Sequence, residues 1–213
     1  MAAERWATFD CYGTLIDWNA GIRGELARVF GEERADELLE RYHELEPELE
    51  ADGTRSYREV LTEAMRRLGA RPGEEDALAR SLPSWEPFPE VRPALEETRR
   101  RGWKLAILSN TDRDFIEASM AAIGVPFERA IVASEIGSYK PALGHWRAFE
   151  EQVGAPPDVH VAASLLHDVA PARELGLRSV WINRLGERAE PKPTRELPDL
   201  ERLPETLDEL VAA

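Results

Sequence analysis

Short apolar runs alternate with longer amphipathic stretches along most of this chain. The runs end in small or polar residues, which is typical of strands buried in a parallel sheet. They cover residues 6–9, 105–108, 130–133, 159–163 and 179–182. Amphipathic patterns that predict helices stand between them, such as 91–101, 113–123 and 144–153. The alternation predicts an α/β fold with a mostly parallel sheet, in which right-handed crossovers place helices on both faces.

One long segment interrupts this alternation between the first two predicted strands. It holds helical patterns, with apolar residues at about 3.6-residue spacing, and no convincing strand. These patterns cover 22–30, 35–49, 56–68 and 74–82. We therefore expect an inserted helical cap over residues 17–83 and a core made of residues 1–16 and 84–213. A stretch with Pro and Trp, 83–93, would return the chain to the core, and the Pro-rich stretch 190–198 would be an extended tail before a short terminal helix.

Composition and charge narrow the classes of partner. The chain has 213 residues, of which 43% are hydrophobic and 32% charged, as in an ordinary globular protein. Its formal net charge is −14, so the overall field repels polyphosphate chains and anionic bilayers. We therefore expect neither nucleic acid nor a membrane as a partner. A small anionic substrate would need a local pocket of Arg, Lys and backbone N–H groups.

The cysteine count and the N-terminal sequence predict where the protein resides. Cys11 is the single cysteine, so an intramolecular disulfide is impossible and a reducing compartment is compatible. The N-terminal sequence MAAERWATFD lacks the charged-then-apolar pattern of a signal peptide, and no apolar run approaches the ~18 residues that span a bilayer. We expect a cytoplasmic protein, and a homodimer stays open.

The residues that follow the predicted strands form the candidate site, because ligands of open α/β sheets bind beyond the carboxyl ends of the strands. The segments are FDCYGTLID with Asp10, LAILSNT with Ser109 and Asn110, YKP with Lys140, and HDVAPARELG with Asp168. A carboxylate at a strand end is a modest nucleophile, but Lys140 nearby would keep Asp10 ionised. N–H groups of the turn could hold an anionic substrate group. The alternatives are a turn carboxylate for Asp10, a surface lysine for Lys140, and plain turn hydroxyls for Thr14 and Ser109.

These four segments, in this order, resemble the motifs of the haloacid dehalogenase superfamily, and the helical insertion matches in position. The resemblance implies a Rossmann-like core in which Asp10 attacks the substrate and forms an ester that water later hydrolyses, helped by Asp168. It implies orienting roles for Thr14 and Ser109 and a catalytic role for Lys140. The candidate substrate contacts are Cys11, Tyr12, Arg41, Asn110, Trp146 and Ser164.

Two departures separate the chain from the phosphatases of that superfamily. In the phosphatases of the superfamily that this chain resembles, a second Asp stands two residues after the nucleophile and protonates an alkoxide leaving group. In this chain the residue at that position is Tyr12. They also have a carboxylate for Mg²⁺ at the end of the fourth strand, where this chain has Ala163 and Ser164. We therefore expect no metal ion and no other cofactor. A halide needs no proton to leave, so the absence of an acid at Tyr12 does not hinder its departure. Tyr12 is also similar to the residue that L-2-haloacid dehalogenases have at this position.

The dehalogenase interpretation assigns a halide cradle to the cap. The resemblance places Arg41 there, completed by Asn110 and nearby aromatic side chains. An equally weighted alternative is a solvated arginine that pairs with Glu37 or Glu44, one turn away on either side. Two further positions depart from the dehalogenase pattern, which has an Asn at Leu165 and a Tyr at Trp146.

The leading hypothesis is hydrolysis of a short 2-haloalkanoic acid, which is a small anionic molecule. The alternative is a related hydrolase or phosphatase that acts on another small anionic substrate. A non-catalytic binding module that kept the fold is a third possibility from a different class. The intact set of Asp10, Ser109, Lys140 and Asp168 argues against this third hypothesis.

Overall fold

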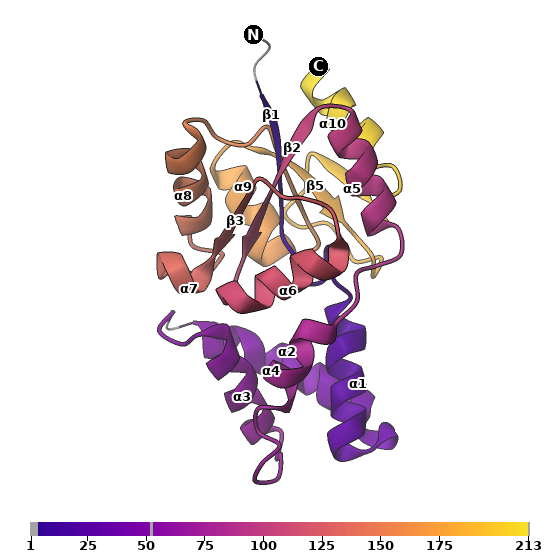
Figure 1. Cartoon of the computed structure of the whole chain (residues 1–213), viewed down its shortest axis with the longest axis vertical. Helices are drawn as coiled ribbons and strands as arrows, with labels where there is room; N and C mark the ends of the chain where they lie inside the picture. The colour runs from indigo at the N-terminus through magenta and orange to yellow at the C-terminus, as the bar shows by residue number, and fades with distance from the viewer. Residues whose placement is uncertain (1–3, 52, 213) are drawn as a thin grey trace.

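The computed structural model describes residues 4–51 and 53–212, and its core is a parallel sheet (Figure 1). In chain order, the strands found in these residues are β1 (Arg5–Phe9), β2 (Trp103–Ser109), β3 (Arg129–Val132), β4 (Val159–Ala162), β5 (Arg178–Ile182) and β6 (Arg195–Leu197). They lie in the order β3-β2-β1-β4-β5-β6, and every neighbouring pair is parallel. The predicted α/β class with a Rossmann-like sheet is confirmed, and β1 to β5 begin and end within two residues of the predicted strands.

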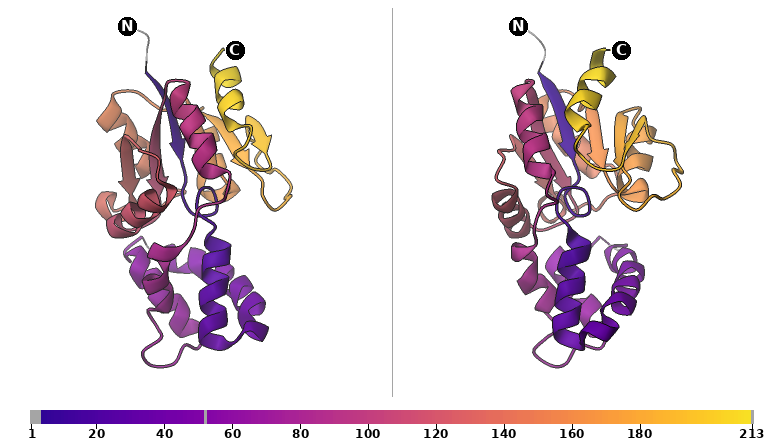
Figure 2. Two further views of the ribbon diagram at one scale, coloured as in Figure 1. Left: turned by 45° about the vertical axis from the view of Figure 1, so that its right-hand side comes forward. Right: turned by 90° about the vertical axis from the view of Figure 1, so that its right-hand side faces the viewer.

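Successive side chains of the strands pack alternately into two separate apolar cores, one on each face of the sheet. On β2, Leu105 and Ile107 join the larger apolar cluster, whereas Ala106 and Leu108 join a smaller one on the opposite face. This two-residue period is what a strand requires when both faces are covered. Helices α5 (Val91–Arg100), α6 (Arg113–Ile123) and α10 (Leu203–Ala212) cover the first face, and α8 (Gly144–Val153) and α9 (Ala170–Glu174) cover the second (Figures 1 and 2).

The chain between β1 and β2 forms a group of helices beyond the carboxyl ends of the strands. Its elements are α1 (Trp18–Phe30), η1 (Glu32–Arg34), α2 (Ala35–Glu50), α3 (Tyr57–Arg67), α4 (Ala77–Ser81) and η2 (Leu82–Ser84). Figure 2 shows them together below the sheet in each view, so they form the cap of the carboxyl edge. The start of α3 is fixed by a capping box, in which Ser56 and Glu59 bond reciprocally.

The Pro-rich stretch near the C-terminus departs from the prediction. Within residues 190–198, Arg195–Leu197 form β6, which pairs with β5 and extends the sheet. The expected extended tail is therefore wrong for these three residues. The strand was missed because β6 is a mostly exposed edge strand, and its sequence Arg-Glu-Leu carries no apolar run.

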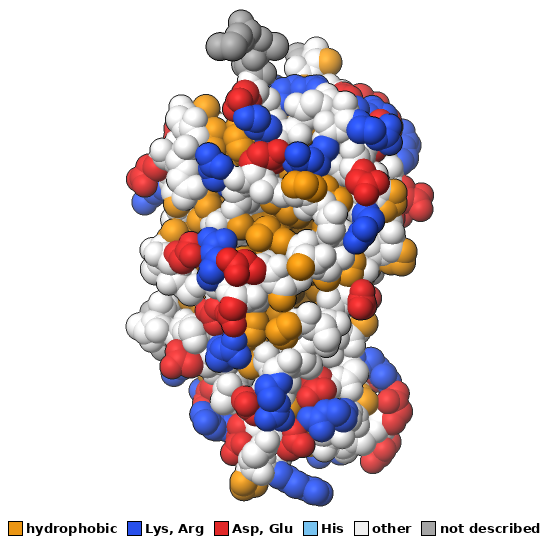
Figure 3. Space-filling view, viewed as in Figure 1, with side chains coloured by type: hydrophobic (Ala, Val, Ile, Leu, Met, Phe, Trp, Pro, Cys, Tyr) orange, Lys and Arg blue, Asp and Glu red, His pale blue; other side chains and the backbone are white. Residues whose placement is uncertain are grey.

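The surface carries both signs of charge. In the space-filling view, Lys and Arg side chains lie beside Asp and Glu side chains over the cap helices (Figure 3). Many charged side chains of the cap pair with one another, as Arg28 does with Glu25 and Glu74. The acidic excess is therefore not gathered in one patch on this face. Among the residues that the structure describes, no helix is both long enough and apolar enough to cross a membrane.

Asp112 ties the cap to the core, and this contact yields a first prediction. Its buried carboxylate accepts the N–H groups of Tyr57 and Arg58, at 3.1 and 3.0 Å, at the start of α3. Because these donors have no partner within their helix, Asp112→Ala should lower the free energy of unfolding by about 1–2 kcal/mol in urea titrations. The control is Asp114→Ala, which removes an exposed ion pair with Arg58 and should cost less than about 0.5 kcal/mol. Equal losses in the two variants would contradict the capping role.

Candidate active site

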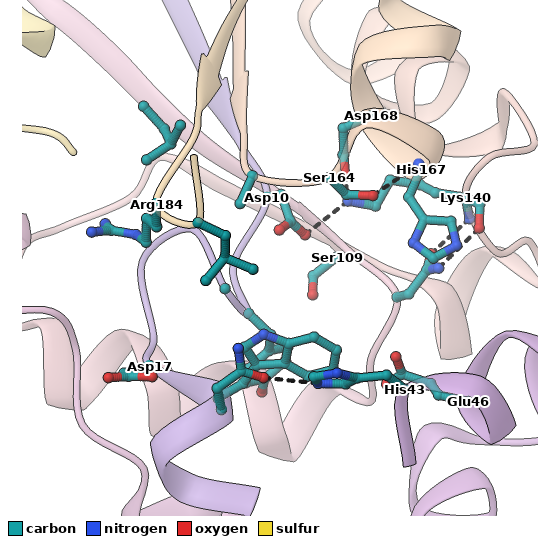
Figure 4. A pocket seen from close by; sticks show the side chains of 18 of the residues that line it. Asp10, Asp17, His43, Glu46, Ser109, Lys140, Ser164, His167, Asp168 and Arg184 are labelled. Atoms are coloured by element: carbon teal, nitrogen blue, oxygen red, sulfur yellow. Dashed lines mark hydrogen bonds and ion pairs between the residues drawn. The ribbon is translucent and has the colours of Figure 1, made fainter. Parts of the chain in front are cut away.

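A cavity of about 610 Å³ lies between the carboxyl edge of the sheet and the cap. The core lines it with Asp10, Ser109, Lys140, Asp168 and Arg184, among others, and the cap lines it with Trp18, His43, Glu46, Glu50 and Tyr57. In Figure 4, Asp10, Ser109 and Asp168 lie on one side of the cavity, and His43 and Glu46 lie on the other. The cavity is therefore the place where core and cap could both contact a small ligand.

Asp10 follows β1 and is held from two directions. Its backbone N–H donates to the carbonyl of Val161 at 3.0 Å, which continues the pairing of β1 with β4. The Thr14 hydroxyl donates to Oδ2 at 2.8 Å, and the Lys140 ammonium donates to Oδ1 at 2.9 Å. The Thr14 oxygen itself accepts the N–H of Ala163 at 2.9 Å, which leaves its single proton for Asp10. The carboxylate is thus fixed in one orientation toward the cavity.

The turn after Asp10 requires a glycine. Gly13 has φ +84°, in the left-handed region, and a Cβ there would lie 2.9 Å from Nε1 of Trp18. The turn is closed by the N–H groups of Leu15 and Ile16, which both donate to the carbonyl of Cys11 at 2.7 and 3.0 Å. This tight path returns Thr14 to the carboxylate of Asp10 and leads the chain into the cap.

Lys140 is a buried cation between two carboxylates. Its ammonium lies 2.6 Å from Oδ1 of Asp168 as well as 2.9 Å from Asp10, and only 1% of its side chain is exposed. Burial alone would lower the pKa of Lys140, but the charges of Asp10 and Asp168 raise it above its ordinary value. Burial likewise opposes ionisation of Asp168, but Lys140 and a hydrogen bond from His160 hold its pKa below the ordinary value. The ammonium and the Asp168 carboxylate are therefore both charged at neutral pH.

Three buried polar atoms of cavity-lining residues have no hydrogen-bond partner among the described residues. They are Oγ of Ser109, Oδ2 of Asp168 and Nε of Arg184. Most buried polar atoms in proteins are paired, so an unpaired one at a cavity indicates a group available to a ligand. Asp168 lies in the short π-helical turn η3 (Leu165–Val169), which begins where the Ser164 hydroxyl accepts the N–H of His167 at 3.0 Å.

The Asn110 side chain connects three segments of the site. Its Oδ1 accepts the backbone N–H of Lys140 at 2.6 Å, and its Nδ2 donates to the Lys140 carbonyl at 3.0 Å. Nδ2 also donates to Oε2 of Glu50 in the cap at 3.1 Å. Asn110 thus fixes the backbone of Lys140 and bonds to the cap at the same time.

The wall that the cap contributes is acidic. Glu46 and Glu50, one turn apart on α2, are both buried, and Glu46 accepts the hydroxyls of Tyr42 at 2.9 Å and Tyr57 at 2.7 Å. Burial raises the pKa of Glu46 to about 7, against the effect of its tyrosine partners. Burial, with the charge of Glu46, raises the pKa of Glu50 to about 9. Near neutral pH, Glu50 is therefore mainly an uncharged hydrogen-bonding acid.

Most of the site residues predicted from the sequence come together. Asp10, Tyr12, Ser109, Asn110, Lys140, Ser164 and Asp168 all line the cavity, and Thr14 reaches Asp10 from behind. The Tyr12 hydroxyl forms a hydrogen bond with Oγ of Ser119 in α6, at 3.1 Å. Tyr12 therefore contributes its ring rather than an acid beside the candidate nucleophile.

Three predicted substrate contacts lie elsewhere. Arg41 is exposed and does not line the cavity, because the residues of α2 that do are His43, Glu46, Pro47 and Glu50. At about 100° per residue, Arg41 lies roughly 140° around the helix from Glu46. Trp146 packs against Trp6 and Phe149 in the smaller apolar cluster. Cys11 is fully buried and is not a lining residue either.

Other residues of the site were not anticipated. Glu46 and Glu50 could have been found from their helical spacing with Tyr42 and Leu49, which marks the buried face of α2. Arg184 follows β5, so it could have been found by examining the end of the fifth strand as well as the first four. His160 gave no such signal, since it lies inside a strand. In the part of the chain that is described, no group of three or more His, Cys, Asp or Glu side chains is arranged to hold a metal ion.

The raised pKa of Glu50 predicts a pH-dependent stability. The folded state prefers the neutral acid, with a pKa of about 9 against an ordinary 4.5. Its contribution to stability is therefore complete below about pH 4.5 and is lost as the pH rises toward 9. Glutamine resembles the neutral acid and does not titrate. Glu50→Gln should thus match the wild type in urea unfolding at about pH 5 and exceed it in midpoint at about pH 9.

A matched control for Glu50→Gln lies on the same helix. Glu48 is mainly exposed, and its contact with Arg67 is a surface ion pair at 3.4 Å. Glu48→Gln should shift the unfolding midpoint little, and by a similar amount at both pH values. A difference between Glu50→Gln and the wild type that does not change with pH would show that the Glu50 carboxyl is not held neutral by the fold.

Comparisons with known proteins give a consistent picture. A family model described as haloacid dehalogenase-like hydrolase matches residues 5–163. An (S)-2-haloacid dehalogenase of Pseudomonas sp. (strain YL) is 31% identical over 191 residues, which cover 84% of this chain and 82% of that protein. A phosphoserine phosphatase of Thermus thermophilus is 30% identical over 183 residues, covering 82% of this chain and 72% of that protein.

The fold is also similar to solved structures. The L-2-haloacid dehalogenase from Xanthobacter autotrophicus, with chloropropionic acid covalently bound, superimposes with a TM-score of 0.82 at 21% identity. The match covers 97% of this chain and 99% of that structure, so it includes the sheet and the cap helices alike. At this level of identity the likeness establishes the fold.

Proposed function

Because the chain belongs to the family of haloacid dehalogenase-like hydrolases, we propose that it hydrolyses the carbon–halogen bond of a short 2-haloalkanoic acid. The observation that carries this proposal is that the Asp10 carboxylate is held facing the cavity while the neighbouring Tyr12 supplies no acid. The carboxylate accepts hydrogen bonds from Thr14 and Lys140. The Tyr12 hydroxyl bonds instead to Ser119. Such a site favours a leaving group that departs without a proton, as a halide does.

The first step is attack by Asp10 on the carbon that bears the halogen. A carboxylate oxygen forms a C–O bond as the C–halogen bond breaks, and the halide leaves with the bonding electrons. Thr14 and Lys140 hold the carboxylate in the attacking orientation, at 2.8 and 2.9 Å. The product of this step is an ester between Asp10 and the 2-carbon of the acid.

The second step is hydrolysis of that ester. Water attacks the Asp10 carbonyl carbon, and Oδ2 of Asp168, which is buried and unpaired, takes the proton of the water. The ester C–O bond then breaks, and Asp168 passes its proton to the departing alkoxide oxygen, which releases a 2-hydroxy acid. The second proton of the water goes to solvent, so that Asp10 and Asp168 are both regenerated as carboxylates. Lys140 lies within hydrogen-bond distance of both carboxylates, so it balances the negative charge in each step.

The substrate carboxylate and the halogen need separate positions in this scheme. The buried Ser109 hydroxyl, which has no partner among the described residues, supports a place for the carboxylate on the core side. The rings of Trp18 and Tyr57 support a place for the halogen toward the cap, whereas both N–H groups of Asn110 Nδ2 are already bonded to Glu50 and to the Lys140 carbonyl. Arg41 is not assigned to the cradle, because it lies outside the cavity.

A second candidate is hydrolysis of a small phosphate ester, and the cap acid favours it. Glu50, with a pKa raised to about 9 by burial and by Glu46, is a protonated acid on the cavity wall. It could supply the proton that an alkoxide leaving group needs and that Tyr12 does not offer. The phosphatase relative makes this comparison worthwhile. Release of phosphate without release of halide, over panels of short esters and short 2-haloacids, would establish the second candidate and reject the first.

The nucleophile is tested by Asp10→Asn. The amide is isosteric but cannot form the ester, so release of chloride from 2-chloropropionate should fall by at least about 10³-fold. Asp17→Asn is the matched control, because Asp17 lines the same cavity but caps α1 by accepting the N–H of Ala20 at 3.1 Å. This control should keep its rate within a few-fold. Mass spectrometry of acid-quenched wild type should show the substrate fragment on Asp10, and Asp10→Asn activity near the wild-type rate would reject the mechanism.

Dependence on a metal ion is tested with a chelator. Ala163 and Ser164 stand at the end of β4 without a carboxylate, so the chloride-releasing reaction is expected to need no Mg²⁺. Dialysis against a chelator should leave the rate unchanged, and adding Mg²⁺ afterwards should not raise it. Loss of activity on dialysis with recovery in Mg²⁺ would favour the phosphatase candidate.

A further inference from the structure

His160 is a buried histidine that the scheme above does not use. It lies on β4 with its side chain fully buried, opposite Thr8 of β1 in the parallel register. Its Nε2 is 2.9 Å from Oδ1 of Asp168, and its Nδ1 is 2.8 Å from the Thr8 hydroxyl. The ring of Trp146 packs edge-on against it, with centroids 5.2 Å apart. The imidazole is therefore held on three sides behind the carboxylate of Asp168.

The hydrogen-bond directions follow from the chemistry of the partners. Asp168 is ionised and can only accept, so Nε2 of His160 carries a proton and donates it. The neutral imidazole then accepts the Thr8 hydroxyl at Nδ1. A protonated imidazole would instead donate to Thr8, whose hydroxyl has the Val159 carbonyl at 3.4 Å as an acceptor. Both ring nitrogens of His160 are therefore paired in either protonation state.

As a consequence, the two carboxylate oxygens of Asp168 differ in their hydrogen bonds. Oδ1 accepts both the Lys140 ammonium at 2.6 Å and the His160 imidazole at 2.9 Å. Oδ2 has no partner among the described residues and is buried at the cavity. With two donors from different directions on one oxygen, the carboxylate cannot rotate without breaking a bond inside the protein. The lone pairs of Oδ2 are thereby presented in one fixed direction.

We infer that His160, supported by Thr8, is a positioning residue for the hydrolysis of the ester intermediate. It holds Asp168 so that Oδ2 faces the water that attacks the Asp10 ester, and it does not contact the substrate. The inference rests on the proposed function, because only a two-step reaction has such an ester. It implies that the two steps differ in the residues they require: Thr14 orients the attack by Asp10, Lys140 contacts the carboxylates of both steps, and His160 serves only the second step.

The test separates the two steps in His160→Leu. Wild type and variant are mixed with excess 2-chloropropionate, and chloride release is followed from the first turnover. In the variant, the first equivalent of chloride should appear at nearly the wild-type rate, while the following turnovers slow by roughly 10–100-fold, as when a partner behind a catalytic group is removed. The ester on Asp10 should then accumulate and be detected by mass spectrometry.

Two milder variants guard against a simple loss of folding. His160→Gln keeps an N–H donor that can reach Asp168, so it should restore part of the second rate. Thr8→Val removes the hydroxyl bonded to Nδ1 without touching Asp168, so it should slow the second step less than His160→Leu does. His145→Leu is the matched control, because His145 is also fully buried but bonds to the Ser109 carbonyl at 3.0 Å and makes no hydrogen bond to Asp168. It should leave the ratio of the two rates unchanged.

The outcomes distinguish this inference from the function on which it rests. If the wild type releases no chloride from any short 2-haloacid, the proposed function fails, and the inference fails with it. If the wild type releases chloride but His160→Leu slows both steps equally, or neither, only the inference is overturned. The same holds if His160→Gln restores nothing although it unfolds at the same urea concentration as the wild type.

Discussion

The buried ammonium of Lys140 is the interaction on which the rest of the site depends. It is almost inaccessible to water and lies within hydrogen-bond distance of Asp10 and Asp168. A buried charge is costly unless it is paired, and here the ammonium pairs with both carboxylates. The segments that follow β1, β3 and β4 are therefore fixed relative to one another. Asn110, at the end of β2, adds the fourth segment by bonding both backbone groups of Lys140.

The core side of the site was predicted from the sequence, whereas the residues of its cap wall were not. Asp10, Ser109, Lys140 and Asp168 follow apolar runs, and the carboxyl edge of a parallel sheet brings such positions together. Arg41 depended instead on the rotational phase of a helix, which residue type does not fix. Burial of Tyr42 and Leu49 turns Glu46 inward and leaves Arg41 in solvent. His160 was hidden because a histidine within a buried strand looks like part of the core.

The acidic cap wall constrains how an anionic substrate can lie in the cavity. Glu50 is kept largely neutral near pH 7 by burial, but Glu46, with a pKa of about 7, carries partial negative charge there. A substrate carboxylate beside Glu46 would meet like charge, which is unfavourable in a buried site. On the core side it would meet the Ser109 hydroxyl and the cation of Lys140. The carboxylate is therefore best accommodated on the core side, with the rest of the molecule toward the cap.

This orientation limits the substrate more than the size of the cavity does. In the proposed reaction, a 2-haloacid with its carboxylate on the core side would present its 2-carbon to Asp10, and its side chain would extend toward Trp18, Tyr57 and Glu46. Aromatic rings tolerate an apolar side chain, whereas Glu46 and Glu50 would accept hydrogen bonds from a hydroxyl or an ammonium group. A second carboxylate at that end would lie beside the partly charged Glu46, which is unfavourable in a buried site. The arrangement therefore disfavours dicarboxylic haloacids, although a cavity of about 610 Å³ has room for them.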